Sequence, residues 1–276
     1  ILNLESVENM TAQNVAASLR GGSHPKEVIE DYWDLRSKSY AQGVTGSKDE
    51  ERGVWKRCLA PFVSDLHIQK ALDGGAVTGF LSFVQYDMGI DVIGTDLSRG
   101  MLSQAREASI KISANLDLCQ GDAESLPFKS SSFDLVTCRH LLWTLPNPAR
   151  ALEEWKRILR LRGRILAIDG NWFDPSAKKK LARWVSGRLK NFSHDQNPVP
   201  FQKFYQPIEK NLPLYQASKP DRCCELFMAA GLADVAVDRL QDVNRFYKRH
   251  TNISFRLSNA DTVFLVKGEK EGMPSR

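Results

Sequence analysis

Residues 73–79 read Asp-Gly-Gly-Ala-Val-Thr-Gly and place an acid directly before a glycine-rich turn, a combination that suits a nucleotide-type ligand. Gly75 permits a tight turn, because glycine adopts positive φ without strain, and Gly79 permits close packing of the helix that follows. Asp73 is placed to accept a hydrogen bond from a ligand ammonium group. The dinucleotide fingerprint G-x-G-x-x-G is absent, which disfavours NAD, and a plain strand-to-helix turn remains an alternative.

A second acid, Asp96, ends the next apolar run, and Ser98 follows it as a natural helix N-cap. An acid at the tip of a strand can accept hydrogen bonds from both hydroxyl groups of a ribose. Met101, in the helix that Ser98 opens, either contacts an adenine or belongs to the helix core, and the spacing leaves both open. The two loops together favour a nucleotide-type ligand at the ends of successive strands.

Short apolar runs that alternate with amphipathic helices position these residues, and this alternation is typical of a parallel sheet covered on both faces. The first five strands are expected at 68–73, 91–96, 115–119, 133–138 and 163–169, with helices at 79–88, 99–112 and 148–160. A helix at 220–230 and strands at 234–239 and 261–267, expected as a hairpin at the sheet edge, complete the pattern. The sequence therefore predicts a doubly wound α/β fold with a mostly parallel, seven-stranded sheet.

Two further segments lie outside this alternation and are interpreted as parts of one domain over residues 23–276. Helices expected at 25–40 and 48–59 make residues 23–66 an N-terminal helical lid, preceded by a flexible arm over residues 1–22. Residues 171–219 are interpreted as a cap or substrate insertion, because so long a segment is unusual as a simple connection.

The composition is that of an ordinary globular chain: of 276 residues, 42% are hydrophobic and 26% are charged. No apolar run approaches the ~20 residues that cross a bilayer, and the first ten residues lack a signal-peptide pattern, so a cytoplasmic location is expected. The five cysteines are scattered, which favours reduced thiols, and no Cys or His spacing suits a metal. A net charge of +5 does not by itself indicate nucleic acid, and none is expected as a partner.

Three more motifs follow the Asp73 loop in order: DLSRGML at 96–102, GDAESLPF at 121–128 and SFDLV at 132–136. Together the four motifs resemble the type 11 group of class I S-adenosylmethionine-dependent methyltransferases, which includes quinone-biosynthesis C-methyltransferases. The likeness extends from about residue 70 to residue 172. It implies a Rossmann-like methyltransferase fold and S-adenosylmethionine as the cofactor.

The resemblance also implies roles for individual residues at the methionine and ribose parts of the cofactor. Asp73, Gly75 and Gly79 would frame the methionine end. Arg139, just past the fourth strand, would approach the same end. Asp96 would hold the ribose.

At the adenine end, the resemblance implies that Leu97 and Met101 flank the ring. Asp122 would accept a hydrogen bond from the exocyclic amine while the Ala123 backbone contacts the ring. The family also places an aromatic residue of the N-terminal helices over the cofactor, and the first helix offers two candidates, Tyr40 and Tyr32.

Two positions depart from this group. The sequence LRG at 161–163 stands where similar sequences read Pro-Gly-Gly, remote from the expected chemistry, and Val77 stands where members usually have a glycine that approaches the cofactor. A β-branched residue resists positive φ and adds bulk. This departure motivates one alternative, a non-catalytic binding protein on the methyltransferase fold. A second alternative, an RNA methyltransferase, is motivated by a basic helix expected within residues 174–190, although no appended RNA-binding module is visible.

A sulfonium methyl group is already activated, so the protein must mainly align the acceptor in line with it and exclude water. If the acceptor must lose a proton, the geometry of the family makes His140 the candidate general base, although a histidine that only lines the pocket fits as well. Trp143, Asp169, Asn171 and Trp172 also lie at strand exits, without assigned roles. We expect methyl transfer to a small-molecule acceptor, whose identity the sequence leaves open together with the oligomeric state.

Overall fold

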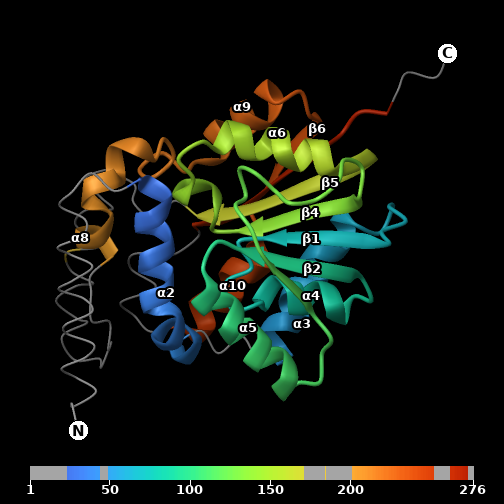
Figure 1. Cartoon of the computed structure of the whole chain (residues 1–276). Coiled ribbons are helices and arrows are strands. Elements are labelled where there is room, and N and C mark those ends of the chain that lie inside the picture. Colours follow the sequence, from blue (N-terminus) through green and yellow to red (C-terminus); the bar gives the residue numbers. More distant parts are fainter. Residues whose placement is uncertain (1–23, 44–48, 171–183, 185–200, 252–261, 273–276) are drawn as a thin grey trace, which may run out of the picture.

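The computed structural model describes residues 24–43, 49–170, 184, 201–251 and 262–272. Within these residues, seven strands form one sheet in the order β3-β2-β1-β4-β5-β7-β6 (Figure 1). The strands are β1 Lys70–Gly74, β2 Asp91–Asp96, β3 Asp117–Gln120, β4 Phe133–Arg139, β5 Leu159–Gly170, β6 Ala233–Asp238 and β7 Val263–Glu269. Strands β1 to β5 pair in parallel, whereas β7 runs antiparallel to β5 and β6. The doubly wound, mostly parallel sheet is therefore confirmed.

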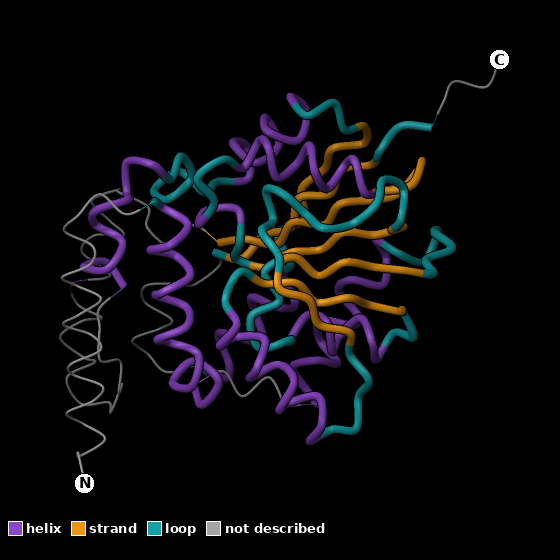
Figure 2. The backbone as a smooth tube through the Cα atoms, viewed as in Figure 1, coloured by secondary structure: helices purple, strands orange, loops and turns teal. Residues whose placement is uncertain are grey.

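Helices cover both faces of the sheet, as the crossovers between parallel strands require (Figure 2). Helices α6 (Pro148–Ile158) and α9 (Pro220–Ala229) pack on one face. Helices α3 (Asp49–Leu59), α4 (Phe80–Asp87) and α10 (Gln241–His250) pack on the other. Because strand side chains alternate between faces, Leu72 and Val136 belong to the first of these cores, and Ala71 and Leu135 to the second. The two cores together fix the register of the central strands.

Helix α2 (Pro25–Gly43) lies across the carboxyl ends of the strands rather than on a face (Figure 1). It packs against α5 (Arg99–Lys111) and against α8 (Phe201–Tyr205) with the following 3-10 helix η4 (Gln206–Asn211). Its inner side buries Val28, Ile29 and Tyr32, which are the positions at helical spacing in the sequence. The expected first helix and its start at Pro25 are confirmed.

The last two strands pair antiparallel at the edge of the sheet, as expected, with β6 as the edge strand and β7 between β5 and β6. Their connection is not a short hairpin turn, because the chain between β6 and β7 forms α10, where no element was expected. Only Val243, Asn244 and Phe246 of this helix are buried, so its apolar stripe is too narrow to stand out from a polar sequence.

The boundary between α6 and β5 also differs from the expectation. The helix ends at Ile158 rather than at residue 160, because Leu159 is extended and pairs with Phe133 of β4. The expected arm at 1–22 and the expected basic helix lie outside the described residues, apart from Trp184. No helix in the described part of the chain is both long and apolar enough to cross a membrane.

Candidate cofactor site

Acidic side chains stand at three neighbouring strand exits of the sheet. Asp73 lies near the end of β1, Asp96 ends β2, and Asp122 follows β3 by two residues. The parallel register pairs Asp73 with Gly94 and Asp96 with Gln120, so the three exits share one edge. This edge of an open α/β sheet is where such folds bind their ligands.

Asp96 is held in place by backbone donors on both sides of the crevice. Its Oδ1 accepts from the amide of Ser98 at 2.9 Å, and its Oδ2 accepts from the amide of Val77 at 2.8 Å. The residue is 8% exposed, and burial raises the pKa of its carboxyl to about 6 against the effect of these amides. Each carboxylate oxygen keeps a further lone pair, so Asp96 can still accept from two hydroxyl groups. Ser98 is the N-cap of α5 as expected, since its hydroxyl accepts from the amide of Met101.

Asp73, in contrast, points into the protein. It is 1% exposed, and its oxygens accept hydrogen bonds from the hydroxyl groups of Ser82 at 2.6 Å and Thr137 at 3.3 Å. Burial raises the pKa of Asp73 to about 6, and the two hydroxyl donors and the nearby Arg139 oppose the shift. Asp73 therefore joins the start of α4 to the centre of the sheet, directly beneath the glycine-rich loop.

The glycine-rich loop contains three residues with positive φ: Gly75 at 65°, Gly79 at 82° and Val77 at 53°. A side chain at Gly75 would come within 2.9 Å of Leu141, so this position needs glycine for space as well as for conformation. Val77 has no such freedom, because a β-branched residue in the left-handed region is strained by about 1–3 kcal/mol. The valine is half-buried, and its amide bonds Asp96, so the loop is tied to β2 through a strained residue.

Asp122 is engaged by a cation from the N-terminal lid. Lys26 of α2 places its Nζ 2.5 Å from Asp122 Oδ2 and 2.7 Å from Glu124 Oε2. Asp122 also accepts from the amide of Glu124, and Ala123 between them is 8% exposed. Burial lowers the pKa of Lys26, but the two carboxylates outweigh it and raise the pKa overall. Helix α2 thus covers the loop to which the adenine-binding role is assigned.

A second contact ties α2 to the loop after β2. Oδ1 of Asp34 accepts from the Ser98 hydroxyl and from the Gly100 amide at the start of α5. Sequence reasoning missed Lys26, Asp34 and Glu124 as site residues, since no local pattern joins residues that lie 64 to 98 positions apart. The helix therefore spans two of the three acidic exits.

Arg139 lies on the side of the sheet that faces α3 and α4. Its guanidinium stands 4.2 Å from the ring centre of Phe80 and 5.6 Å from that of Trp55. Such cation–π contacts hold a guanidinium without neutralising it. Arg139 is thus fixed close to Asp73, although it bonds neither oxygen of that carboxyl.

The remaining predicted residues are distributed along α2 and α5. Met101 is fully buried, whereas Leu97 is half-buried and packs against the core beneath α6 and α9. Tyr40 lies near the end of α2 and makes an edge contact with Trp33 at 5.7 Å between ring centres. Tyr32, earlier in the same helix, is 2% exposed and lies within an aromatic cluster.

That aromatic cluster joins α2 to the chain that follows β4 and to residues 201–215. It comprises Tyr32, Trp143, Phe201, Tyr205 and Tyr215, which come from α2, the 3-10 helix η3 (Leu142–Thr144), α8 and the chain after η4. Phe201 and Tyr205 stack at 4.0 Å, and Tyr205 and Tyr215 lie nearly parallel at 6.4 Å. Aromatic faces of this kind suit an apolar or planar partner.

His140 stands at the exit of β4 next to Asp169 at the end of β5. The distance from His140 Nδ1 to Asp169 Oδ1 is 3.8 Å, and the side chains are 25% and 1% exposed. Burial lowers the pKa of His140, and the carboxylate opposes that shift. His140 also has a φ of 59°, the left-handed region.

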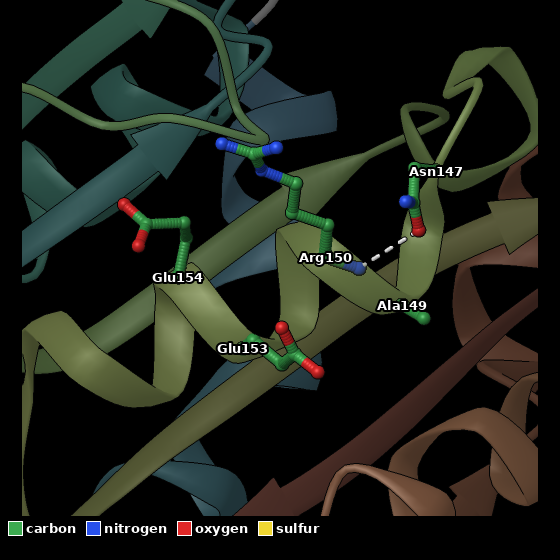
Figure 3. Close-up of a pocket in the computed structure, with 5 residues that line it drawn as sticks. All are labelled: Asn147, Ala149, Arg150, Glu153 and Glu154. Carbon is green, nitrogen blue, oxygen red and sulfur yellow. Dashed lines mark hydrogen bonds between the residues drawn. The ribbon is translucent and has the colours of Figure 1, made fainter.

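Away from the crevice, the start of α6 forms a shallow hollow (Figure 3). Its lining residues are Asn147, Ala149, Arg150, Glu153 and Glu154. Figure 3 shows their polar ends pointing in different directions, and the bond that it marks is the N-cap contact from the Arg150 amide to Asn147 Oδ1. This hollow has no set of converging groups. No three Cys, His, Asp or Glu side chains are arranged to hold a metal among the described residues.

Part of the chain is similar in sequence to known methyltransferases. Residues 72–167 match the family model described as a methyltransferase domain. Demethylmenaquinone methyltransferases from Renibacterium salmoninarum and Paenarthrobacter aurescens are 33% and 35% identical to the chain over 145 residues. These residues are 52% of this chain and 59% and 55% of the two relatives, so the match spans little more than half of each.

Solved structures extend the likeness at the level of the fold. A phosphoethanolamine N-methyltransferase 2 from Haemonchus contortus, in complex with S-adenosyl-L-methionine, is similar with a TM-score of 0.59 and 16% identity. The alignment covers 91% of this chain and 61% of that one. Together with the strand order, this agreement confirms the class I methyltransferase fold.

Proposed function

Residues 72–167 form a methyltransferase domain related to those of the demethylmenaquinone methyltransferases, and on this premise we propose that the protein transfers the methyl group of S-adenosylmethionine to a small-molecule acceptor. The observation that carries the proposal is that Asp96, the glycine-rich loop and Asp122 converge on one edge of the sheet. The acceptor itself is the least constrained part, because specificity resides in loops and caps rather than in the fold.

The donor and acceptor groups at this edge fit an adenosyl ligand. Asp96 is nearly buried at the end of β2, and its two oxygens accept from the backbone amides of Ser98 and Val77. The two unused lone pairs match the two hydroxyl groups of a ribose. In the proposed complex Asp96 holds the ribose.

At the methionine end, Gly75 and Gly79 allow the loop backbone to approach the ligand. Arg139, held over its aromatic platform, supplies the positive charge that attracts a carboxylate. Asp73 frames this end indirectly, because its carboxyl is already bonded to Ser82 and Thr137. We assign Asp73 the role of fixing the loop rather than that of binding the ammonium group directly.

At the adenine end, Asp122 accepts from the exocyclic amine and the Ala123 backbone contacts the ring. Leu97 and Met101 at the start of α5 form the apolar side, with Met101 contributing from within the core. Tyr40 covers the ligand from α2. In this arrangement the adenine amine takes the place that the Lys26 ammonium now has on Asp122.

Replacing Lys26 by Met is therefore expected to tighten binding of S-adenosylhomocysteine by about two- to fivefold. The ion pair is partly exposed, and pairs of this kind contribute roughly 0.5–1 kcal/mol, which the ligand must overcome. Isothermal titration calorimetry at 50 mM and at 500 mM NaCl, roughly below and above physiological ionic strength, measures the effect and its salt dependence. Lys38→Met removes an exposed charge from the same helix and is the matched control. Weaker binding by the Lys26 variant alone would show instead that Lys26 belongs to the binding surface.

When bound, the sulfonium supplies an activated methyl group, which leaves sulfur as the new bond to the acceptor forms in line. The protein then has to orient the acceptor and exclude water. Helix α2 and the aromatic cluster lie over the crevice and suit the second task. Their apolar rings also favour a small apolar or planar acceptor, which accords with relatives named for a quinone precursor.

For an acceptor that must lose a proton, we assign the general base to His140. Burial lowers the pKa of its imidazole, so the neutral form that can take a proton predominates at neutral pH. The side chain is one-quarter exposed at the strand exit where an acceptor would lie. An acceptor without an acidic proton needs no such base.

A second candidate function is that of a binding protein that keeps the methyltransferase fold but has lost productive cofactor binding, which the strained Val77 favours. Val77 stands where members of the resembled group have glycine, and its backbone amide bonds Asp96. An RNA substrate, in contrast, rests on the basic helix expected at 174–190, which lies outside the described residues.

Calorimetry with S-adenosylhomocysteine tests the cofactor part of the proposal. We expect saturable binding of one ligand per chain at micromolar concentration. Methyl transfer is then measured as formation of S-adenosylhomocysteine from S-adenosylmethionine in the presence of planar phenols and quinols. Saturable binding with turnover of one of them would support the enzyme, whereas the absence of a calorimetric signal would favour the binding protein.

The affinity for S-adenosylhomocysteine is expected to fall by up to about tenfold for each pH unit below 6. Asp96 has a raised pKa of about 6, so its carboxyl is protonated below this pH and accepts hydroxyl groups more weakly. Stability has the opposite sign. A raised folded-state pKa means that the contribution of Asp96 to stability is present below its unfolded pKa of 3.8 and is lost as pH rises through 6.

Calorimetric titrations at pH 5.0, 5.5, 6.5 and 7.5, with thermal melts of the free protein, separate the two effects. An affinity that stays flat across this range would contradict the role of Asp96.

A further inference from the structure

His140 and Asp169 lie side by side at the carboxyl ends of the neighbouring strands β4 and β5. The register of β4 and β5 pairs Cys138 with Ala167 and Arg139 with Ile168, so His140 and Asp169 occupy the next matching positions. The His140 amide donates to the carbonyl oxygen of Ile168 at 2.8 Å. The pair is thus placed by the sheet itself rather than by flexible loops.

Both side chains belong to the same face of the sheet. Side chains alternate along a strand, and Cys138 and Ala167, two positions earlier, both lie in the core beneath α6 and α9. His140 Nδ1 and Asp169 Oδ1 are 3.8 Å apart, slightly beyond a hydrogen bond, as is common for catalytic pairs without a ligand. The imidazole therefore stands between the crevice and a buried carboxylate.

Asp169 lacks the donors that a buried carboxylate ordinarily has. Its Oδ1 accepts from the Gly170 amide at 2.7 Å, but its Oδ2 has no hydrogen-bond partner within the part of the chain that the structure describes. Burying an unpaired carboxylate oxygen destabilises the folded protein. A buried carboxylate that is not needed for stability is therefore a candidate for a functional role. The side-chain donors that face this carboxylate are His140, whose Nδ1 lies 3.8 Å from Oδ1, and the hydroxyl of Ser218.

Several titratable or charged groups among the described residues act on the pair. Arg139 of β4 lowers the pKa of His140, and Asp169 raises it. Around Asp169, burial raises the pKa values of the Cys138 and Cys223 thiols, so both are neutral. The Ser218 hydroxyl lies close enough to lower the pKa of Asp169. Asp169 is thus the carboxylate that faces the imidazole.

Backbone conformation points to the same residue. His140 has a φ of 59°, in a region that side chains with a Cβ rarely adopt. Strain of this kind is retained where the surroundings over-determine it, and it clusters at functional sites.

We propose that Asp169 is the positioning residue of His140, in that its carboxylate holds Nδ1 as a donor and leaves Nε2 as the proton acceptor that faces the crevice. This inference rests on the proposed function, in which His140 takes the proton that the methyl group replaces on the acceptor. The proton then resides on Nε2, and the carboxylate stabilises the resulting imidazolium. The same geometry sets the tautomer before any ligand arrives.

The tautomer can be read directly in the wild-type chain. Long-range proton–nitrogen NMR correlations of protein labelled with ¹⁵N-histidine, at about pH 8, distinguish the two neutral forms, and His140→Gln assigns the signal among the five histidines. We expect Nδ1–H at His140. An Nε2–H tautomer would overturn the proposal without any variant having to fold.

Asp169→Asn provides the second measurement. Removing a charge at this distance is expected to lower the pKa of His140 by about one unit or more, read from an NMR titration. Asp221→Asn, which removes an exposed charge at the start of α9, is the matched control and should leave that pKa unchanged. If the pKa of His140 were the same in both variants, Asp169 would not act on the imidazole, and the contact would be structural only.

Neither NMR measurement depends on turnover. With an active acceptor in hand, the acid limb of the rate profile should move to lower pH in Asp169→Asn. Failure of S-adenosylhomocysteine to bind would refute the proposed function while leaving the tautomer result intact.

Discussion

Asp96→Asn is expected to weaken binding of S-adenosylhomocysteine by about 100-fold. A hydrogen bond to a charged acceptor is worth about 1.5–3 kcal/mol, and an amide in this place can accept from the ribose on one side only. The amide also presents a donor to the backbone N–H of either Val77 or Ser98, which now meet a carboxylate. Calorimetry measures the affinity, and thermal melts show how far the fold tolerates the change.

Asp91→Asn is the matched control for this variant. Asp91 is the exposed first residue of the same strand, at the end opposite Asp96. It should bind S-adenosylhomocysteine as the wild type does. If the Asp96 variant kept wild-type affinity while folding normally, the ribose would not lie at the end of β2.

Val77→Gly is expected to raise the affinity for S-adenosylhomocysteine by about tenfold and to leave the protein at least as stable. The valine has a φ of 53° at a cost of about 1–3 kcal/mol, and glycine removes this strain while losing about 0.5–1 kcal/mol to backbone entropy. Removal of the isopropyl group from a loop whose amide bonds Asp96 is expected to give the ligand room. Calorimetry and melting temperature measure the two effects separately.

Ser113→Gly separates the two effects by design. Ser113 has the same φ of 53° but follows α5 at its far end. Relief of strain alone would stabilise both variants and change the affinity of neither. A Val77 variant that gained stability without affinity would mean that the valine side chain does not crowd the cofactor.

Local signals in the sequence predicted the parts of the site that are built locally. The Ser98 N-cap and the acid at the end of β2 depend on residues within a few positions of one another, and both are confirmed. The resemblance to class I methyltransferases is likewise confirmed, because its motifs fall within the matched residues 72–167. The specific roles of the site residues stay predictions.

The direction of Asp73 was open to prediction from alternation along its strand. Ala71 faces α4, so a side chain two positions on faces α4 as well, and there it meets Ser82. Its position at the end of the strand alone led instead to the prediction that Asp73 accepts a hydrogen bond from the ligand. The periodic pattern of a strand is thus the better guide to what its last acid contacts.

Other features had no signal within reach. The pairing of Lys26 with Asp122 and Glu124 joins a helix to a loop 96 residues later, and only packing of α2 across the strand ends brings them together. Helix α10 was missed because its buried stripe is three residues wide. Contacts set by tertiary packing cannot be read from periodicity in one segment.

A crystal structure of the chain with S-adenosylhomocysteine tests the central claim most directly. The account predicts ribose hydroxyl groups within about 2.6–3.2 Å of Asp96 and the adenine amine on Asp122, with Lys26 displaced from that carboxylate. A ligand bound elsewhere, or a crevice in which the Val77 side chain occupies the ribose position, would contradict it.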